Sequence, residues 1–448
     1  MPMPGWRDAL PQDYGLWIML CLAVLLGGGG RGYALYNLAV QLGALLILAF
    51  SFPQVRAFFS VASWPLKSLV CLTIALPVIQ LIPLPPALWS ALPGRDLVME
   101  SFTLIGEEDR WFPISVAPSL TRLAAIGLIA PFTVLILSTR LDFGRRVLAL
   151  QLFVGLGLVN VLIGATQLIT NGATKFYSGG QSDDLFGSFA NHNSSGFFLV
   201  VALCAVIELM HALRPKGVAK GWYIAISATL ALSVTLSQSR SSMGLLIVPM
   251  ILAITRLTPY LKIRSWNRQR VWIGAAAILL CLAGAAAMIL QSGRVEQSFS
   301  RFDSLEDARP GIWEDSWASR KRFWPVGAGM GTFDEVFQLD ESLENLRPQR
   351  AGRAHNDYLE IMVESGIIGP LMIVLWATYL IWVLRGSRNS RTDIRFGLLA
   401  IITCFALQSG VDYPMRSQAL LCIAALAIGL LEATRRDEAK GNQIASVD

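Results

Sequence analysis

Residues 194–213, SSGFFLVVALCAVIELMHAL, decide the fold of this chain, because they form an apolar run long enough to cross a lipid bilayer. Similar runs recur along the 448 residues, of which 54% are hydrophobic and only 15% are charged. They lie at approximately 14–30, 33–52, 66–84, 120–138, 145–169, 194–213, 222–237, 241–257, 271–291, 359–384, 394–410 and 418–433. The sequence therefore predicts an all-α polytopic membrane protein with about 12 transmembrane helices.

Lysine and arginine residues are concentrated in alternate connections between these runs. If the N-terminus is cytoplasmic, most basic residues of the short loops fall on the inner side, in segments such as 139–146, 214–220 and 256–270. The positive-inside rule therefore favours a cytoplasmic location for both termini. The basic loop at 292–358 would then be extracytoplasmic, which the rule permits because long loops cross largely regardless of their charge.

The composition excludes several other kinds of protein. The net charge of +6 reflects the topological bias, and the basic residues form no stripe interleaved with aromatic residues, so we expect no nucleic-acid partner. All six cysteines fall in predicted spans and are expected to be small apolar fillers. Asp183 and Asp184 alone would make a poor metal site, so we expect neither a metal nor a cofactor. The first apolar run lacks a small-residue cleavage site and is expected to be a retained span.

The runs and loops divide the chain into three parts. Residues 1–170 hold the N-terminal spans and a proline-rich outer loop at 85–118, which we expect to be a solvated connector. Residues 171–433 hold the remaining spans and the large outer loop at 292–358, and residues 434–448 form a polar cytoplasmic tail.

The large loop contains signals for short helices. Arg309-Pro310 is typical of a helix start, and Trp313 and Trp317 share one helix face because they are four residues apart. Tryptophan favours the membrane–water interface, so we expect this helix to lie on the bilayer surface. The glycines of residues 327–331 do not follow a strand, so they predict a turn and no dinucleotide site.

Unusual polar residues collect on the predicted outer face. They come from four separate segments, residues 186–196, 237–242, the loop that ends at His355, and 408–416. Arg240 lies in a very short connection between two apolar spans, where a cation is expected to face a cavity or a partner. It either extends to the outer headgroups or binds an anion, since a guanidinium matches phosphate oxygens.

His355 is the candidate catalytic residue. Its unperturbed pKa near 6.5 suits proton abstraction from a hydroxyl, although a structural hydrogen-bonding role is equally open. Arg353 stands two residues before it, Arg309 heads the predicted surface helix, and Arg294 follows the ninth span closely. His192, with Asn191 and Asn193, is expected to cap the sixth span.

At these residues the chain resembles the O-antigen ligase and polymerase family of bacterial membrane glycosyltransferases. The resemblance rests on His355-Asn-Asp-Tyr-Leu359 with Glu364-Ser-Gly366, on Ser239-Arg-Ser-Ser-Met-Gly244, on residues 309–313 and 327–331, and on the turn at 189–193. Residues 180–410 match in motif order and loop placement, whereas the first 170 agree only in their hydrophobic spans. The implied fold is like that of the GT-C glycosyltransferases, with one large extracytoplasmic loop containing short helices.

The resemblance implies an inverting transfer without metal or cofactor, from a polyprenyl-diphosphate-linked glycan to an acceptor sugar hydroxyl. By this resemblance Arg240 and Arg309 bind the diphosphate, and Arg294 or Arg301 is a third ligand. Arg353 and Asn356 contact substrate, while His355 orients or deprotonates the acceptor. The protein would lie in the bacterial inner membrane with its active site facing the periplasm, and the acceptor would be lipid A–core sugar or another glycan.

The sequence leaves several functions open. A ligase, a repeat-unit polymerase and a protein O-oligosaccharyltransferase share this signature. A non-catalytic transporter of lipid-linked sugars is disfavoured, because polar groups gather at one surface and no internal repeat is visible. A structural or signalling membrane protein would leave the convergence of the four polar segments without explanation.

Overall fold

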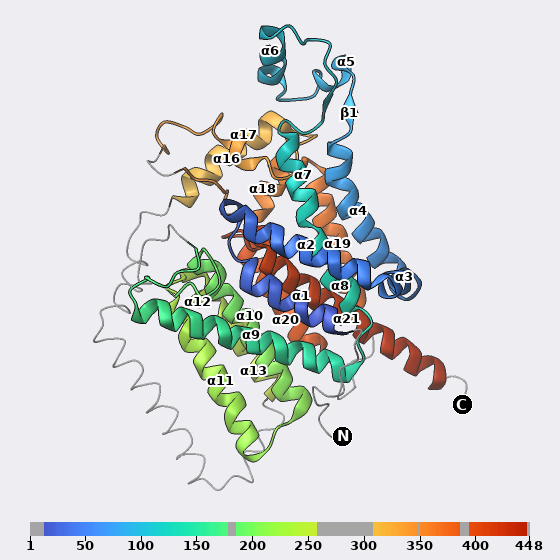
Figure 1. Ribbon diagram of the computed structural model, residues 1–448, viewed down its shortest axis with the longest axis vertical. Coiled ribbons are helices and arrows are strands. Elements are labelled where there is room, and N and C mark those ends of the chain that lie inside the picture. The colour runs from blue at the N-terminus through green and yellow to red at the C-terminus, as the bar shows by residue number, and fades with distance from the viewer. Residues whose placement is uncertain (1–12, 178–184, 258–307, 347–349, 386–393, 446–448) are drawn as a thin grey trace. The chain divides into compact units, whose positions relative to one another are not determined.

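The computed structural model describes residues 13–177, 185–257, 308–346, 350–385 and 394–445, and this part of the chain is mostly helical (Figure 1). The chain forms two compact units. The first comprises Met1–Arg146, Asp307–Ser390 and Phe405–Asp448, and the second comprises Val147–Glu306 and Arg391–Cys404. Each unit is described by itself below.

The first unit contains the N-terminal helices, the helices of the large loop and the C-terminal helix. Its helices are α1 (Tyr14–Leu26), α2 (Ala34–Phe50), α3 (Phe52–Val61), α4 (Trp64–Gln80), α5 (Pro86–Trp89), α6 (Asp96–Leu104), α7 (Pro118–Gly127), α8 (Ile129–Ser138), α16 (Arg309–Phe323), α17 (Phe333–Phe337), α18 (Asp357–Ser365), α19 (Ile368–Leu384) and α21 (Gln418–Ala445). Two 3₁₀ turns, η3 (Arg31–Tyr33) and η6 (Pro414–Arg416), and strands β1 (Pro83–Leu84) and β2 (Phe112–Pro113) complete it.

The core of the first unit is the contact between α8 and α21, with α1 packed against both. Gly429 of α21 lies so close to Ser138 of α8 that a side chain at position 429 would overlap its hydroxyl. Small residues of this kind let membrane helices approach closely and gain van der Waals contact. Beside this core, α4 packs on α7 and α19.

The second unit is built around α10 (His192–Leu213), which packs on α11 (Gly217–Leu236), α12 (Arg240–Leu245) and α13 (Ile247–Leu257). Helices α9 (Phe143–Ile169) and α20 (Arg395–Ser409) run across the boundaries between the units. Glu208, a carboxylate within the apolar α10, pairs with Arg256 of α13 at 2.6 Å. A charged side chain within a membrane helix is costly unless it is paired, so this ion pair is expected.

The predicted spans correspond closely to helices. Five described helical segments are long and apolar enough to cross a membrane, and α2 with α3 makes a sixth if the pair, bent by 79°, is one span. Four shorter apolar helices, α1, α4, α19 and α20, coincide with other predicted spans. The span expected at 271–291 lies outside the described residues, so twelve spans stay a prediction.

The predicted span at 359–384 is two helices, α18 and α19, with a break at Gly366. Gly366 has a φ of +56°, and a side chain there would overlap the carbonyl of Pro325. The polypeptide of the large loop therefore packs directly against the break, which a hydropathy pattern does not reveal. The predicted span at 241–257 is likewise divided into α12 and α13, and α21 continues as a helix through most of the expected tail.

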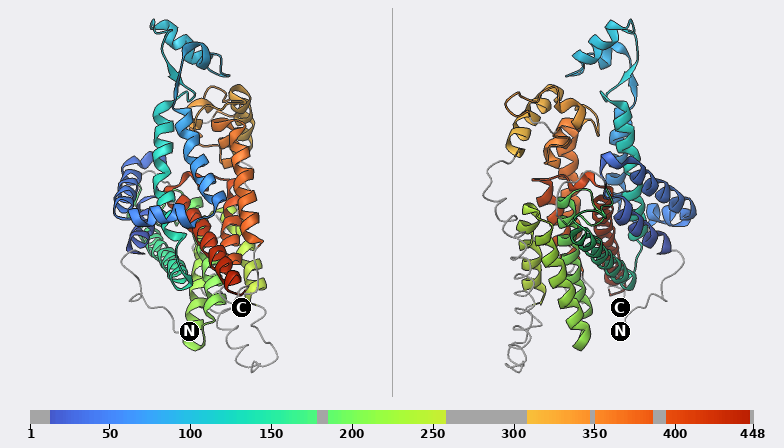
Figure 2. Two further views of the ribbon diagram at one scale, coloured as in Figure 1. Left: turned by 90° about the vertical axis from the view of Figure 1, so that its right-hand side faces the viewer. Right: turned by 60° about the vertical axis from the view of Figure 1, so that its left-hand side comes forward.

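Residues 85–118, which were expected to be a solvated connector, have local structure of their own. Strands β1 and β2 pair antiparallel, with Pro83 opposite Pro113, and enclose α5 and α6. Trp89 is fully buried and makes edge contacts with Phe102 and Phe112. These aromatic rings give the loop a small core of its own, and it projects from the end of the first unit that carries α16 and α17 (Figures 1 and 2).

Candidate active site

His355 lies in the turn that starts α18, in a constrained backbone conformation. Its φ is +49°, a left-handed value that is uncommon for residues other than glycine, although asparagine, aspartate and histidine adopt it more often than the rest. Asn356 follows in extended conformation, and its side-chain oxygen accepts a hydrogen bond from the Leu359 amide at 3.1 Å. Such strained residues persist where surrounding contacts determine them, and they cluster at functional sites. The turn therefore fixes the direction of the imidazole.

The His355 ring pairs with a buried carboxylate. Its Nδ1 lies 3.2 Å from Oδ1 of Asp412, in the segment between α20 and η6. The Asp412 side chain is 4% exposed and that of His355 is 25% exposed. Gln408 donates to the other Asp412 oxygen, and the Tyr413 ring meets the imidazole edge-on. The carboxylate thus orients the imidazole at one nitrogen and leaves Nε2 without a bond to any described residue.

This arrangement suits a general base. A buried carboxylate at one ring nitrogen selects the tautomer whose other nitrogen can accept a proton, and it stabilises the imidazolium that forms. Sequence reasoning placed residues 408–416 on the same face as His355 but assigned no role to Asp412. The two residues are 57 positions apart, and only their contact in the fold identifies the pair.

Three acidic residues occupy the buried face of α18 beneath this pair. Asp357, Glu360 and Glu364 are all buried, and Arg416 of η6 reaches all of them. Its Nη1 lies 2.8 Å from Glu364, and its Nε lies 3.2 Å from Glu360 and 3.6 Å from Asp357. Burial disfavours the Arg416 cation, but the carboxylates outweigh this effect and hold its pKa above the usual value.

Asp357 connects α18 to the segment that carries Asp412. Its Oδ2 accepts hydrogen bonds from the Ser409 hydroxyl and the Met415 amide, both at 3.0 Å. Burial raises the pKa of Asp357 from 3.8 to about 7, although Arg416 opposes the shift. Asp357 and Arg416 therefore clasp residues 409–416 against α18, on both sides of Asp412. The acidic spacing i, i+3 and i+7 on one helix face was a signal that could have predicted a buried cationic partner.

Helix α16 holds the His355 turn from the other side. The indole of Trp313 donates to the Ala354 carbonyl at 2.9 Å, and Ala354 belongs to a buried cluster with Phe323, Phe333 and Val363. Arg309, the first residue of α16, is half-buried and lies one turn before Trp313 on the same face. Helix α16 begins at Arg309-Pro310, as predicted. Its first turns contact Ala354, the residue that precedes His355.

The two other predicted substrate contacts near His355 have structural partners. Arg353 pairs with Glu360 through Nη1 at 2.7 Å, and Asn356 caps α18. Direct contact of either residue with substrate stays a prediction.

The glycine-rich segment 327–331 is a turn, as predicted. Gly327, Gly329 and Gly331 all have positive φ, and the amides of Ala328 and Gly329 donate to the carbonyls of Val363 and Glu364. A side chain at 327 would come within 2.6 Å of the Glu364 carbonyl. Glycine is therefore required for the turn to lie against the end of α18.

A fully buried arginine ties the loop at 85–118 to this turn. Arg95 donates to the carbonyls of Gly327 at 2.7 Å, Pro93 and Ile114, and burial lowers its pKa to about 10. Its guanidinium lies over the Phe323 ring. Nothing in the sequence pattern marked Arg95 among the basic residues of the outer loops.

In the second unit, two of the four predicted outer segments meet. Arg240 is the first residue of α12, which Ser239 caps by accepting from the Ser242 amide. The Ser242 hydroxyl donates to the Asn193 carbonyl at 3.3 Å. Asn191, rather than His192, caps α10, and the His192 ring stacks on Phe186. Residues 186–193 and 237–242 are therefore neighbours, as expected for one face.

The candidate residues are distributed over both units. His355, Arg353, Asn356 and Arg309 belong to the first unit and Arg240 to the second. Arg294 and Arg301 lie outside the described residues, as do Asp183 and Asp184. The meeting of Arg240 with His355 therefore stays a prediction. Within the described ranges, no group of three histidine, cysteine, aspartate or glutamate side chains is placed to hold a metal ion.

The apolar helices and this site define a multi-pass membrane protein with a histidine–carboxylate pair at one end of its first unit. Residues 225–374 match the family model described as O-Antigen ligase, a stretch that includes Arg240, Arg309 and His355. The exopolysaccharide production protein ExoQ of Rhizobium meliloti is 26% identical over 234 residues, which are 48% of this chain and 51% of that protein. The chain thus spans about half the length of this curated relative. These matches confirm the predicted resemblance to the O-antigen ligase family.

Proposed function

We propose that this protein transfers a glycan from a polyprenyl-diphosphate carrier to an acceptor hydroxyl at the outer face of the bacterial inner membrane. The observation that carries the proposal is the pairing of His355 with Asp412 at 3.2 Å, in a chain whose residues 225–374 match the O-antigen ligase family. A partly exposed imidazole oriented by a buried carboxylate is what deprotonation of a hydroxyl requires.

In the proposed step, Nε2 of His355 takes the proton of the acceptor hydroxyl. The hydroxyl oxygen attacks the anomeric carbon from the face opposite the diphosphate, so configuration inverts. The bond between that carbon and the diphosphate oxygen breaks, and polyprenyl diphosphate leaves with the bonding electrons. Asp412 stabilises the imidazolium until the proton passes to solvent. The atoms and charges balance without a metal or a cofactor.

The departing diphosphate requires positive charge. We propose Arg240 and Arg309 as its ligands, with Arg294 or Arg301 as a third, because guanidinium groups match phosphate oxygens and stabilise developing charge. Arg309 is supported by its place one turn before Trp313, whose indole binds the carbonyl next to His355. Arg353 and Asn356 are assigned to positioning His355, since one pairs with Glu360 and the other caps α18.

Three candidate activities differ in the acceptor that receives the glycan. An O-antigen ligase would use lipid A–core sugar, a polymerase would use another lipid-linked repeat, and a protein O-oligosaccharyltransferase would use a protein hydroxyl. Similarity to a protein named for exopolysaccharide production supports polysaccharide as the product class. We therefore favour a ligase or polymerase.

Deletion of the gene, followed by analysis of surface glycans, tests this function. Loss of long polysaccharide with accumulation of lipid-linked polymer supports a ligase, and accumulation of single lipid-linked repeats supports a polymerase. Loss of glycan from a secreted protein supports protein glycosylation. Complementation with wild-type protein should restore the glycan, whereas an inserted His355→Ala protein should not. Unchanged surface glycans in the deletion strain would contradict the proposal.

The orientation of the protein has its own test. A cysteine at Ser342, in the large loop, should react with a membrane-impermeant thiol reagent in intact spheroplasts after the native cysteines have been replaced. Labelling only after membrane disruption would place this loop in the cytoplasm and contradict a periplasmic site.

A further inference from the structure

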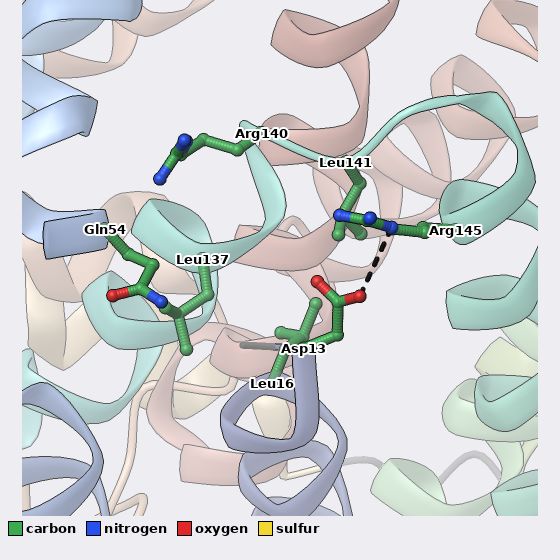
Figure 3. Close-up of a pocket in the computed structure, with 7 residues that line it drawn as sticks. All are labelled: Asp13, Leu16, Gln54, Leu137, Arg140, Leu141 and Arg145. Carbon is green, nitrogen blue, oxygen red and sulfur yellow. Dashed lines mark ion pairs between the residues drawn. The ribbon is translucent and has the colours of Figure 1, made fainter. Parts of the chain in front are cut away.

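A pocket lies at the end of the first unit opposite the catalytic end. It is lined by Asp13, Gln54, Arg140, Arg145 and leucines of α1, α8 and the segment after α8 (Figure 3). The empty space between these residues is about 400 Å³, and part of it is open to solvent. Neither the proposed reaction nor the comparisons assigns it a role.

The pocket and the candidate active site are separated by roughly the thickness of a bilayer. Helices α7 and α8 together run from Pro118 to Ser138, 21 residues, which corresponds to about 30 Å of helix. Near the start of α7, Thr121 donates to Met330 in the glycine-rich turn. Arg140 follows the far end of α8. The pocket therefore faces the leaflet opposite His355, which the positive-inside rule makes the cytoplasmic one.

Among the described residues that line the pocket, Arg140 is the cation that no carboxylate neutralises. Arg145 is neutralised by Asp13 at 3.3 Å and by Asp142 at 3.4 Å. The exposed guanidinium of Arg140 makes no side-chain bond to another described residue, and neither does the Gln54 amide. Both line the pocket (Figure 3), where Arg140 and the Gln54 amide nitrogen can donate hydrogen bonds, while Gln54 Oε1 is a buried acceptor that has no partner among the described residues. The Arg140 guanidinium therefore gives the pocket its capacity to bind an anion.

The surrounding helices support negative charge at this place. Helix α1 begins immediately after Asp13, and Gln54 is the third residue of α3, so the positive ends of two helix dipoles lie at the pocket. The negative end of α8 is compensated, because Arg436 donates to the carbonyls of Thr139 and Arg140.

An apolar surface adjoins the donors. Phe50 and Phe52, at the bend between α2 and α3, are 82% and 67% exposed, and Gln54 is two residues further on. A soluble anion would not use these rings, whereas the acyl chains of a lipid would cover them. We propose that the pocket binds the phosphodiester headgroup of an anionic phospholipid from the inner leaflet, with Arg140 and Gln54 as donors to the phosphate.

The proposal is tested on the full-length protein in detergent. Short-chain phosphatidylglycerol, short-chain phosphatidylcholine and inorganic phosphate are titrated separately, and binding is followed by thermal stabilisation and by native mass spectrometry. Phosphatidylglycerol should stabilise the protein and remain bound. Arg140→Gln should weaken this binding by about tenfold or more, because it removes a charge-assisted hydrogen bond. Gln54→Glu, which places a negative charge in the pocket, should weaken it in the same direction.

Arg56→Gln is the matched control, since Arg56 is an exposed arginine of α3 that does not line the pocket. It should bind phosphatidylglycerol like the wild type. Equal binding of phosphatidylcholine would overturn the requirement for an anionic headgroup. Equal stabilisation by inorganic phosphate alone would replace the lipid by a free ion. An equal loss in Arg56→Gln would show general attraction to the surface and contradict a defined site.

Discussion

Replacing Arg416 by glutamine should destabilise the protein severely. Arg416 is the cation within reach of three buried carboxylates, at 2.8 Å from Glu364, 3.2 Å from Glu360 and 3.6 Å from Asp357. Removing one partner of a buried ion pair costs about 3–5 kcal/mol, because an uncompensated charge remains in a medium of low polarity. The upper part of this range is expected, since Arg353 still compensates Glu360 but does not pair with Glu364 in the described structure.

The measurement is equilibrium unfolding of purified protein in mixed micelles, compared with Arg110→Gln. Arg110 pairs with Glu107 in the loop at 85–118, and the two side chains are 54% and 48% exposed. An exposed pair contributes about 0–1 kcal/mol. The cost of Arg416→Gln should also diminish at low pH, where the carboxylates take up protons. If the free energies of unfolding of the two variants differ by less than about 1 kcal/mol, the buried cluster does not stabilise the site as described.

Three further results are expected. Asp412→Asn should lower kcat by about 10²–10⁴-fold with little change in the KM for donor, because His355 loses its orienting carboxylate. Steady-state kinetics with purified donor measures both constants, and a rise in KM as large as the fall in kcat would contradict this role. Burial raises the folded-state pKa of Asp357 from 3.8 to about 7. The protonated carboxyl therefore contributes its full stability to the folded protein below about pH 4, and this contribution is lost as the pH rises through 7. Wild-type protein should therefore lose up to about 4 kcal/mol relative to Asp357→Asn across this window, as unfolding at several pH values can show. Arg240→Ala should abolish transfer while insertion and expression persist, and retained activity in membranes would remove this residue from the site.

The positions of the apolar helices could be predicted from sequence because hydrocarbon thickness sets a minimum run of apolar residues. That constraint does not depend on tertiary contacts, so α1, α2, α4, α9, α10, α18, α20 and α21 all begin within a few residues of the expected spans. The break at Gly366 could not be predicted in this way. It depends on the approach of the Pro325 carbonyl, which is a contact between distant parts of the chain.

The same distinction, between local pattern and contacts of distant residues, applies to the candidate site. His355 and the helix start at Arg309 were identified from residue type and local pattern. Asp412 and Arg95 were not, because each acts through a partner far along the chain, at 57 residues for Asp412 with His355 and 232 residues for Arg95 with Gly327. For Arg353, the structure adds an ion pair with Glu360 that the sequence did not suggest, and its contact with substrate stays a prediction.

The most direct test of the central claim is single-turnover transfer by purified protein from a polyprenyl-diphosphate oligosaccharide to an acceptor glycan. His355→Ala should slow the transfer step by about 10²–10⁴-fold, as expected for loss of a general base, while the donor binds as tightly as before. Transfer at the wild-type rate in His355→Ala, or a deficit explained wholly by weaker donor binding, would contradict a general base at His355.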